Sequence, residues 1–214
     1  MDYMDYQNTA NAVGDCLLSY TKDESGWKVC KKSNDVIVSW RPSTEFPGNV
    51  YKGESVVKGS PEKVWECLKP VPNGLRVKWD NNVKKFELVE QVTENVTVCR
   101  TVTPSAAMGI IAPRDFVDVI LVKQYEDGTI TSNATHVSHP SCPPQSGYVR
   151  GFNHPCGCIC VPISGEPNKT QLFSFFQTDL GGFLPRSVVD SFFPSSMVEF
   201  YSNLAKAIKS LKDH

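Results

Sequence analysis

LPRSVVDSFFPSSMVEFYSNLAKAIKSLK, residues 184–212, is the stretch that decides the fold of this chain. Its apolar side chains recur in steps of three or four residues, at Val189, Phe193, Met197, Phe200, Leu204, Ile208 and Leu211. This spacing places them along one side of a helix. It therefore predicts a long C-terminal helix whose broad apolar face has to be covered by the rest of the chain.

Both ends of this stretch carry the signals of helix ends. Pro185 suits a first helical position, because the N–H that proline lacks would have no partner inside the helix. Lys206, Lys209 and Lys212 crowd the other end, where the exposed carbonyls and the helix dipole favour cations. Pro194 cannot donate a hydrogen bond to the preceding turn, so it predicts a bend within the helix rather than its end.

Composition narrows the class of protein. The chain has 214 residues and a formal net charge of −1, so it lacks the excess of positive charge with which proteins bind nucleic acid. No run of about 18 apolar residues occurs, and the segment MDYMDYQNTANAVGDC lacks the regions of a signal peptide. We therefore expect a single domain over residues 1–214, soluble, cytoplasmic and monomeric, whose eight cysteines are free thiols.

Outside the C-terminal stretch, the patterns predict mostly strands. A first helix is expected over residues 5–20, because apolar side chains lie there at helical spacing. Two short helices are expected between Ser60 and Trp79, the first with Ser60 as N-cap and Pro61 at its first position. Period-two alternation predicts strands at residues 27–31, 36–41, 50–57, 84–91, 95–103, 115–124, 129–137, 148–162 and 171–178. Strands without alternating helices indicate an antiparallel sheet, and the economical arrangement curves this sheet around the C-terminal helix.

The segment PSAAMGIIAP, residues 104–113, is apolar but does not fit a strand. Prolines bound it and Gly109 splits it, so it is expected to be a loop that carries Met108, Ile110 and Ile111. An apolar loop either folds onto the core or covers a cavity or touches a membrane, and the residues leave these possibilities open.

Several motifs are similar to those of a known family. Five segments resemble the START domain: the C-terminal stretch, WRPSTEFPGNVYKGE (residues 40–54), LRVKWD (75–80), PRDFVDV (113–119) and YVRGFNHPCG (148–157). This is the lipid-transfer domain related to the steroidogenic acute regulatory protein, and the resemblance is greatest to small cytosolic members made of one START domain. It implies an α+β helix-grip fold, in which a curved antiparallel sheet wraps the C-terminal helix and leaves an internal lipid tunnel.

The resemblance also implies a buried arginine in the tunnel. The arginine that matches the family pattern is Arg114, and sterol-binding relatives give it an acidic partner near the preceding turn. By ungapped spacing that position is Asn95, with Glu94 beside it. An arginine without an internal carboxylate is free to bind an anionic ligand, such as a bile-acid carboxylate, in bidentate fashion. Alternatively, Arg114 pairs with Asp118 or a nearby carbonyl as a scaffold contact.

Further ligand contacts are predicted from polar and apolar groups on the expected elements. Polar candidates are Thr103, Ser132, Asn153, His154 and Thr178, and Arg76 with Trp79 is expected to line the other end of the tunnel. Each of these polar residues alone is more often a satisfied core group than a ligand contact. Apolar walls are expected from Phe176, Phe193, Met197, Phe200 and Tyr201, with Met108 and Ile111 contributed by the loop.

Metal and enzyme readings have weaker support. His154, Cys156, Cys158 and Cys160 lie close together in sequence, but three cysteines at alternate positions of a strand point in one line and cannot close a tetrahedral zinc site. No nucleophile elbow or paired acid and base is present in the sequence, so an enzyme remains an alternative by analogy of fold only. No cofactor is expected.

The prediction for function is an intracellular carrier that binds one sterol or bile-acid molecule and transports or buffers it, with transient membrane contact. A lipid-sensing scaffold remains the main alternative. Ligand entry is expected to require separation of the loop at residues 104–113 from the part of the C-terminal helix that follows Pro194.

Overall fold

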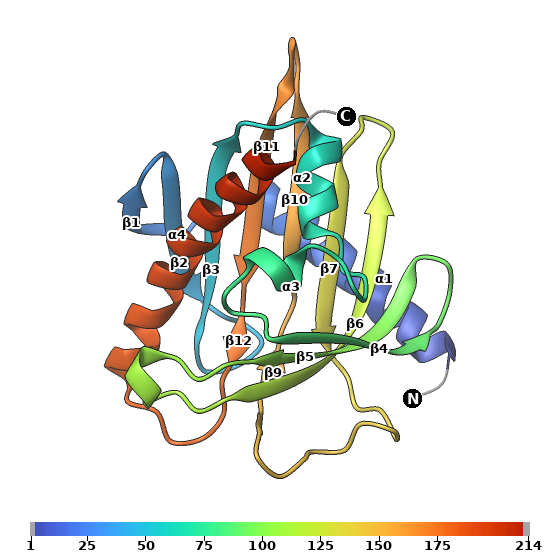
Figure 1. The fold of residues 1–214 in the computed structure, drawn as a ribbon, viewed down its shortest axis with the longest axis vertical. Coiled ribbons are helices and arrows are strands. Elements are labelled where there is room, and N and C mark those ends of the chain that lie inside the picture. The colour runs from blue at the N-terminus through green and yellow to red at the C-terminus, as the bar shows by residue number, and fades with distance from the viewer. Residues whose placement is uncertain (1–2, 212–214) are drawn as a thin grey trace.

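A large antiparallel sheet carries helices on both faces in the computed structural model, which describes residues 3–211 (Figure 1). The helices are α1 (Tyr3–Lys22), α2 (Pro61–Leu68), α3 (Arg76–Trp79) and α4 (Arg186–Ser210), with a 3-10 turn, η1, at Ala107–Gly109. The strands are β1 (Lys28–Ser33), β2 (Val36–Pro42), β3 (Asn49–Val57), β4 (Lys85–Gln91), β5 (Val96–Thr103), β6 (Arg114–Gln124), β7 (Ile130–His136), β8 (Val149–Arg150), β9 (Phe152–Asn153), β10 (Cys156–Ile163), β11 (Glu166–Phe176) and β12 (Thr178–Asp179).

The strand order of the main sheet is β1-β2-β3-β11-β10-β7-β6-β5-β4, with the short β8 paired in parallel to one end of β6. A separate two-stranded pair joins β9 to β12. The sheet is strongly curved, so β4 and β5 run almost across the direction of β3 and β11 in Figure 1. Helix α1 lies behind the sheet, whereas α2, α3 and α4 lie on its other face. The predicted α+β fold, a curved antiparallel sheet on a long C-terminal helix, is confirmed.

One predicted strand is wrong. The alternation over residues 148–162 indicated a single strand, but the chain forms three separate segments there, β8, β9 and β10. Gly151 separates the first two at a close approach, because a Cβ at this residue would lie 2.3 Å from the ring of Phe116. Pro155, which has no N–H for a ladder, stands before β10. The breaks carry Asn153 away from the main sheet and into the pair with β12.

Helix α4 confirms the prediction of one long helix over the C-terminal stretch. It runs through Pro194 without interruption, and Pro185 is its N-cap instead of its first helical residue. The predicted basic residue Lys212 lies outside the described residues. The buried face of the helix consists of Phe193, Pro194, Ser196, Met197, Phe200, Tyr201, Leu204 and Ile208. The turns before Pro194 are mostly exposed or half-buried.

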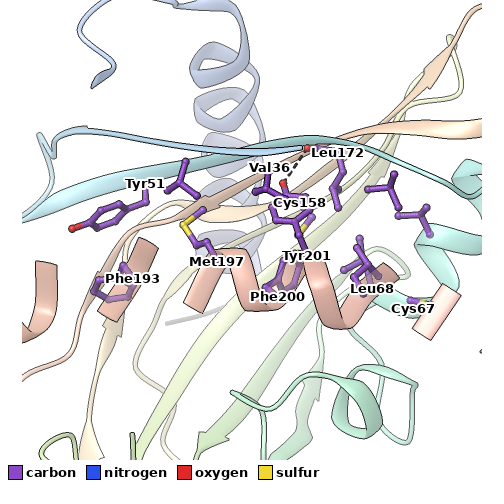
Figure 2. Close-up of a cluster of buried hydrophobic side chains, with 14 of the residues drawn as sticks. Val36, Tyr51, Cys67, Leu68, Cys158, Leu172, Phe193, Met197, Phe200 and Tyr201 are labelled. Atoms are coloured by element: carbon purple, nitrogen blue, oxygen red, sulfur yellow. Dashed lines mark hydrogen bonds between the residues drawn. The ribbon is translucent and has the colours of Figure 1, made fainter. Parts of the chain in front are cut away.

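The second half of α4 is tied to the sheet. The buried hydroxyl of Tyr201 donates to the carbonyl oxygen of Leu172 on β11 at 3.0 Å (Figure 2). It also contacts the Ser174 hydroxyl at 2.9 Å. Gly53 on β3 permits this approach, because a Cβ there would lie 2.7 Å from Ser174 Oγ and 2.8 Å from the Tyr201 ring. This part of the helix is therefore a fixed support.

The other predicted end signals are found as expected. Ser60 caps α2 by accepting a hydrogen bond from the Lys63 amide at 3.3 Å, and Pro61 opens the helix. The turn at Glu126–Gly128 joins β6 to β7, with Gly128 at a φ of 90°. Among the described residues, no helix has the length and apolar character that crossing a membrane requires.

Candidate ligand cavity

A cavity of about 250 Å³ lies between the sheet and the helices of its inner face. Strand β6 shows how the sequence builds it, because side chains alternate across a strand. Arg114, Phe116, Asp118 and Ile120 face the cavity, whereas the intervening Val117 packs in a separate core with α1. The volume is slightly below the range of about 300–1,000 Å³ for small-molecule sites, so the cavity has room for one ligand at most.

The cavity wall is mainly apolar, with polar groups scattered over it. Aromatic and aliphatic side chains of β6, β11, α4 and the loop before β6 form most of it, among them Ile111, Phe116, Ile120, Phe176, Phe192, Phe193 and Phe200. The polar side chains at the wall are Arg76, Asp80, Asn82, Thr101, Thr103, Arg114, Asp118, Ser132, Asn153, Thr178 and Ser196, with Lys69 at the edge formed after α2. Such a lining binds a mostly apolar molecule and fixes its orientation at a few points.

Arg76 is the charged group best placed to receive a ligand. Its Nε donates to the Asp80 carboxylate at 2.8 Å, and its guanidinium lies 5.2 Å from the centre of the Phe200 ring. Among the described residues, its two Nη groups donate no hydrogen bond. Its side chain is 30% exposed and the cavity lies against it. Burial acts to lower the Arg76 pKa, but the charge of Asp80 raises it above its usual value, so the group stays cationic.

Arg114 has a different position from the one that an anion anchor needs. Its guanidinium donates to three backbone carbonyl oxygens, Ala112 at 2.7 Å, Leu180 at 2.9 Å and Gly181 at 3.0 Å. Within residues 3–211 it makes no salt bridge, and burial lowers its pKa. The scaffold alternative with neighbouring carbonyls therefore describes Arg114, and the Asp118 pairing does not occur. Its bonds fasten the loop before β6 to the loop before α4.

The predicted counterpart of the family's acidic partner is also misplaced. Asn95 and Glu94 are exposed at the turn between β4 and β5. Register pairs Thr103, at the opposite end of β5, with Arg114. The ungapped spacing therefore placed the partner of Arg114 at the wrong end of β5. The loop at residues 104–113 reverses the chain direction, so the start of β6 lies beside the end of β5.

Asp118 and Asn153 form a second polar centre at the wall. Asn153 Nδ2 donates to Asp118 Oδ2 at 2.9 Å, and the Thr178 hydroxyl donates to Asn153 Oδ1 at 2.8 Å. Asp118 is only 5% exposed, and its Oδ1 has no hydrogen-bond partner among the described residues. Burial raises the Asp118 pKa to about 7, since the bond from Asn153 and the charge of Arg150 offset only part of the desolvation.

The structure brings most of the predicted contact residues together at this cavity. Those at its wall are Arg76, Thr103, Ile111, Arg114, Ser132, Asn153, Phe176, Thr178, Phe193 and Phe200. They come from the inner face of the sheet, from α3, from α4 and from the loops beside β6 and β12. Several already have internal partners, since Thr103 Oγ1 accepts from the Arg114 amide at 3.3 Å and Ser132 Oγ accepts from the Cys158 amide at 3.4 Å.

Five predicted contacts lie away from the wall. Tyr201 is bonded to the Leu172 carbonyl of β11 instead. Trp79 packs on the outer side of Phe200, with its ring N–H donating to the Cys67 carbonyl at 2.9 Å. Met197 is directed at Gly53 of β3, because it projects from α4 toward the sheet beside Tyr51 (Figure 2).

The other two are displaced by local structure. His154 stacks on Phe46, with ring centres 4.6 Å apart, because the break after β9 turns it outward. Met108 is fully exposed, at the tip of the tight turn η1, while Ile111 of the same loop is buried at 2% exposure.

Two loops that Arg114 ties together carry exposed apolar side chains. Met108 and Ile110 belong to the loop before β6, and Phe183, which is also fully exposed, belongs to the loop before α4. Arg114 holds both loops through its bonds to Ala112 and Gly181. These side chains form an apolar rim outside the cavity, here called the loop rim and defined by Met108, Ile110 and Phe183.

Within the described residues, no group of three or more His, Cys, Asp or Glu side chains is arranged to hold a metal ion. All eight cysteines are free thiols. Cys156, Cys158 and Cys160 follow one face of β10, and burial raises the pKa of each above its ordinary value. They are therefore neutral apolar wall and core residues at neutral pH.

Comparison with known proteins agrees with this architecture. The family model of the START domain matches residues 10–214. The chain belongs to the START family. StAR-related lipid transfer protein 5 of Mus musculus is 64% identical to this START domain over 200 residues, which cover 94% of each chain. The Homo sapiens protein of the same name is 61% identical over 204 residues, covering 95% of this chain and 96% of that one.

A solved structure of human StAR-related lipid transfer protein 5 has a TM-score of 0.95 to this START domain. It is 57% identical in sequence and covers 99% of this chain and 100% of its own. Family membership assigns the chain to the lipid-binding and lipid-transfer proteins, and these relatives are named as lipid transfer proteins.

Sequence reasoning missed several members of this START site, among them two carboxylates. Asp80 follows Arg76 by four residues, which is the spacing of an ion pair on a helix, so the pair could have been found. Asp118 follows Arg114 by four residues on the same strand, so the two side chains point to the same face of the sheet, toward the cavity. Phe192 and Ser196 had no comparable signal, because their orientation depends on where α4 crosses the sheet.

Proposed function

We propose that this START domain encloses one sterol-sized amphipathic molecule, a sterol or a bile acid, and carries it between membranes through the cytosol as a monomer. The observation that carries the proposal is the apolar cavity with Arg76 at its wall, whose two Nη groups have no partner among the described residues. The free thiols fit the reducing conditions of the cytosol.

Arg76 favours a ligand that combines a rigid apolar ring system with an anionic group. Its guanidinium fork matches a carboxylate in bidentate geometry, and Asp80 holds it in place from the other side through Nε. The Phe200 ring lies 5.2 Å from the guanidinium and 5.8 Å from the Phe176 ring, and the two rings provide apolar contact for a ring system. A bile acid supplies both parts, whereas cholesterol supplies a hydroxyl in place of the carboxylate.

Burial of apolar surface provides the main driving force for binding. A dry cavity of about 250 Å³ costs up to about 6 kcal/mol at about 24 cal/mol per Å³. A ligand that fills it recovers part of this free energy, so the loaded protein is more stable than the empty one. The polar groups then determine orientation rather than total affinity.

Delivery requires an opening, and the loop rim is the part of the surface best suited to touch a membrane. Met108, Ile110 and Phe183 are exposed apolar side chains on adjacent loops, which suits shallow insertion at an apolar–water boundary. The half of α4 after Pro194 has one face buried and is tied to β11 by Tyr201, so it is less suited to move than the sequence suggested. We infer that the exposed turns before Pro194 and the loop before β6 separate instead.

The test is calorimetric titration of delipidated protein with cholic acid and with a solubilised sterol, on the wild type and Arg76→Gln. Saturable binding of cholic acid, weakened at least about tenfold by Arg76→Gln, is expected, because a charged hydrogen bond contributes about 1.5–3 kcal/mol. Arg41→Gln, which alters an arginine paired with Asp23 outside the cavity, is the matched control. No saturable binding of either ligand to the wild type would overturn the proposal.

Transfer between vesicles separates a carrier from a lipid-sensing scaffold. Donor vesicles with a fluorescent sterol or bile acid are mixed with acceptor vesicles and catalytic amounts of protein. A carrier multiplies the transfer rate in proportion to its concentration. Stoichiometric ligand binding without faster transfer would favour the scaffold.

A further inference from the structure

Asp118 has an open hydrogen-bonding position inside the cavity. The side chain is only 5% exposed and lies at the cavity wall, and its Oδ1 has no partner among the described residues. Leaving a buried acceptor unsatisfied costs about 1–3 kcal/mol, so such a group in a binding cavity calls for a partner that arrives with the ligand.

The neighbouring amide is oriented so that only one carboxylate oxygen is satisfied. The Thr178 hydroxyl donates to Asn153 Oδ1 at 2.8 Å, which directs Asn153 Nδ2 at Asp118 Oδ2, 2.9 Å away. The backbone of Asn153 is also held, because its carbonyl oxygen lies 2.7 Å from His136 Nδ1 and 3.3 Å from the Thr135 hydroxyl. Asn153 is therefore a fixed support that leaves Oδ1 available.

The groups around Asp118 do not supply the missing donor. Cys99 of β5 and His136 of β7 are its cross-strand partners, and Cys156 of β10 is within electrostatic reach. Arg150 of β8 acts on Asp118 by its charge, but its hydrogen bonds go to Asp115 and to backbone carbonyls. Burial keeps both thiols neutral by raising their pKa values.

The chemistry of this position selects a neutral hydroxyl. A hydroxyl donates one hydrogen bond to a carboxylate without the desolvation cost of bringing a cation into the cavity. A ligand carboxylate is repelled by Asp118 and attracted by Arg76, and Cys156 lies within electrostatic reach of both charges. The two groups thus give the cavity wall one anion-binding group and one hydroxyl-binding group.

We propose that Asp118, supported by Asn153 and Thr178, binds a ring hydroxyl of a hydroxylated steroid and so sets the direction in which the ligand lies. This inference rests on the proposed function and adds the chemical class of ligand that the cavity prefers. Hydroxylated steroid acids supply a partner for both groups, whereas the same skeleton without hydroxyls leaves Asp118 Oδ1 unsatisfied.

The test compares cholic acid with 5β-cholanic acid, which has the same skeleton and carboxylate but no hydroxyl. The measured quantity is the ratio of the cholanic to the cholic dissociation constant. Asp118→Asn keeps the shape of the side chain but removes the charge, so we expect this ratio to fall about five- to tenfold. Asp127→Asn, the same change in the exposed turn between β6 and β7, should leave the ratio at its wild-type value.

An unchanged ratio in Asp118→Asn, with both acids still bound, would overturn the Asp118 site alone. Absence of saturable binding of both acids to the wild type would overturn the proposed function together with this inference. If Asp118→Asn does not fold, the carboxyl carbon of Asp118 is titrated by NMR in wild-type complexes with each acid. A hydroxyl that donates to the carboxylate lowers the Asp118 pKa in the cholic complex relative to the cholanic complex, and coincident titration curves would overturn the site.

Discussion

Filling the cavity from its helical side should stabilise the empty protein and abolish its response to ligand. Ser196 lies on the buried face of α4, is 7% exposed and contributes to the cavity wall. Ser196→Phe projects an apolar ring into space that costs up to about 6 kcal/mol when it is empty and dry. A ring that occupies about a third of this volume recovers about 2 kcal/mol.

These free energies translate into melting temperatures. For a chain of this length, about 1 kcal/mol corresponds to about 2–4 °C, so unliganded Ser196→Phe should melt about 4–8 °C above the delipidated wild type. Ligand at about 100 times its dissociation constant adds about 2.7 kcal/mol to the wild type, a rise of about 5–11 °C. The variant should show little of this second rise, because the space for the ligand is occupied.

The assay is thermal unfolding followed by circular dichroism, with and without cholic acid, on delipidated proteins. Ser202→Phe, the same substitution on the exposed face of α4, serves as the control and should keep the wild-type response to ligand. A full ligand response in Ser196→Phe would show that the ligand binds elsewhere. A lower melting temperature without ligand would show that the space does not accept a ring, which contradicts the volume argument.

Three further predictions concern charge, packing and membrane contact. Burial raises the Asp118 pKa to about 7, above about 3.9 for an unfolded aspartate. The folded state therefore holds the proton more tightly, and the contribution of Asp118 to stability is full below about pH 4 and is lost as the pH rises through about 7, by about 4 kcal/mol. In urea unfolding, the free energy of unfolding of Asp118→Asn should exceed that of the wild type by up to that amount at pH 7.5 and by little at pH 4. An equal difference in this free energy at both pH values would refute the burial argument. Gly53→Ala should destabilise the protein by about 1–3 kcal/mol, because its Cβ would overlap Ser174 and Tyr201, and unchanged urea stability would show that α4 can shift without cost. Replacing Met108 and Phe183 by serine should slow transfer between vesicles about tenfold or more and leave the ligand dissociation constant unchanged. The reason is that each exposed side chain contributes about 1.5–3 kcal/mol when it is fully buried. An undiminished transfer rate would remove the loop rim from the mechanism.

The architecture could be predicted from the sequence because it depends on local periodicity. The steps of three and four from Phe193 to Ile208 correspond to the buried face of α4, and Ser60 and Pro61 mark the start of α2. These signals act within one element and need no knowledge of its neighbours. The strand expected over residues 148–162 was wrong because contacts between elements, such as Gly151 against Phe116, break the ladder there.

The residues that contact the cavity were less predictable, because a side chain on an element beside the cavity can still point away from it. Arg114 was correctly placed at the start of β6, but the carbonyls that bind it come from residues 112, 180 and 181, two of which are distant in sequence. Met197 and Ser196 are neighbours on α4, yet only Ser196 lies at the cavity wall. The difference depends on the position of the helix over β3, which no local pattern specifies.

The central claim is that one steroid lies in the cavity between the sheet and α4, with its anionic end at Arg76. The most direct test is a crystal structure of the delipidated protein in complex with cholic acid. The account predicts one ligand per chain, enclosed by Ile120, Phe176 and Phe200, with its carboxylate bound by the Nη groups of Arg76. An empty cavity, with the acid bound instead in the groove between Phe46 and Val189, would contradict it.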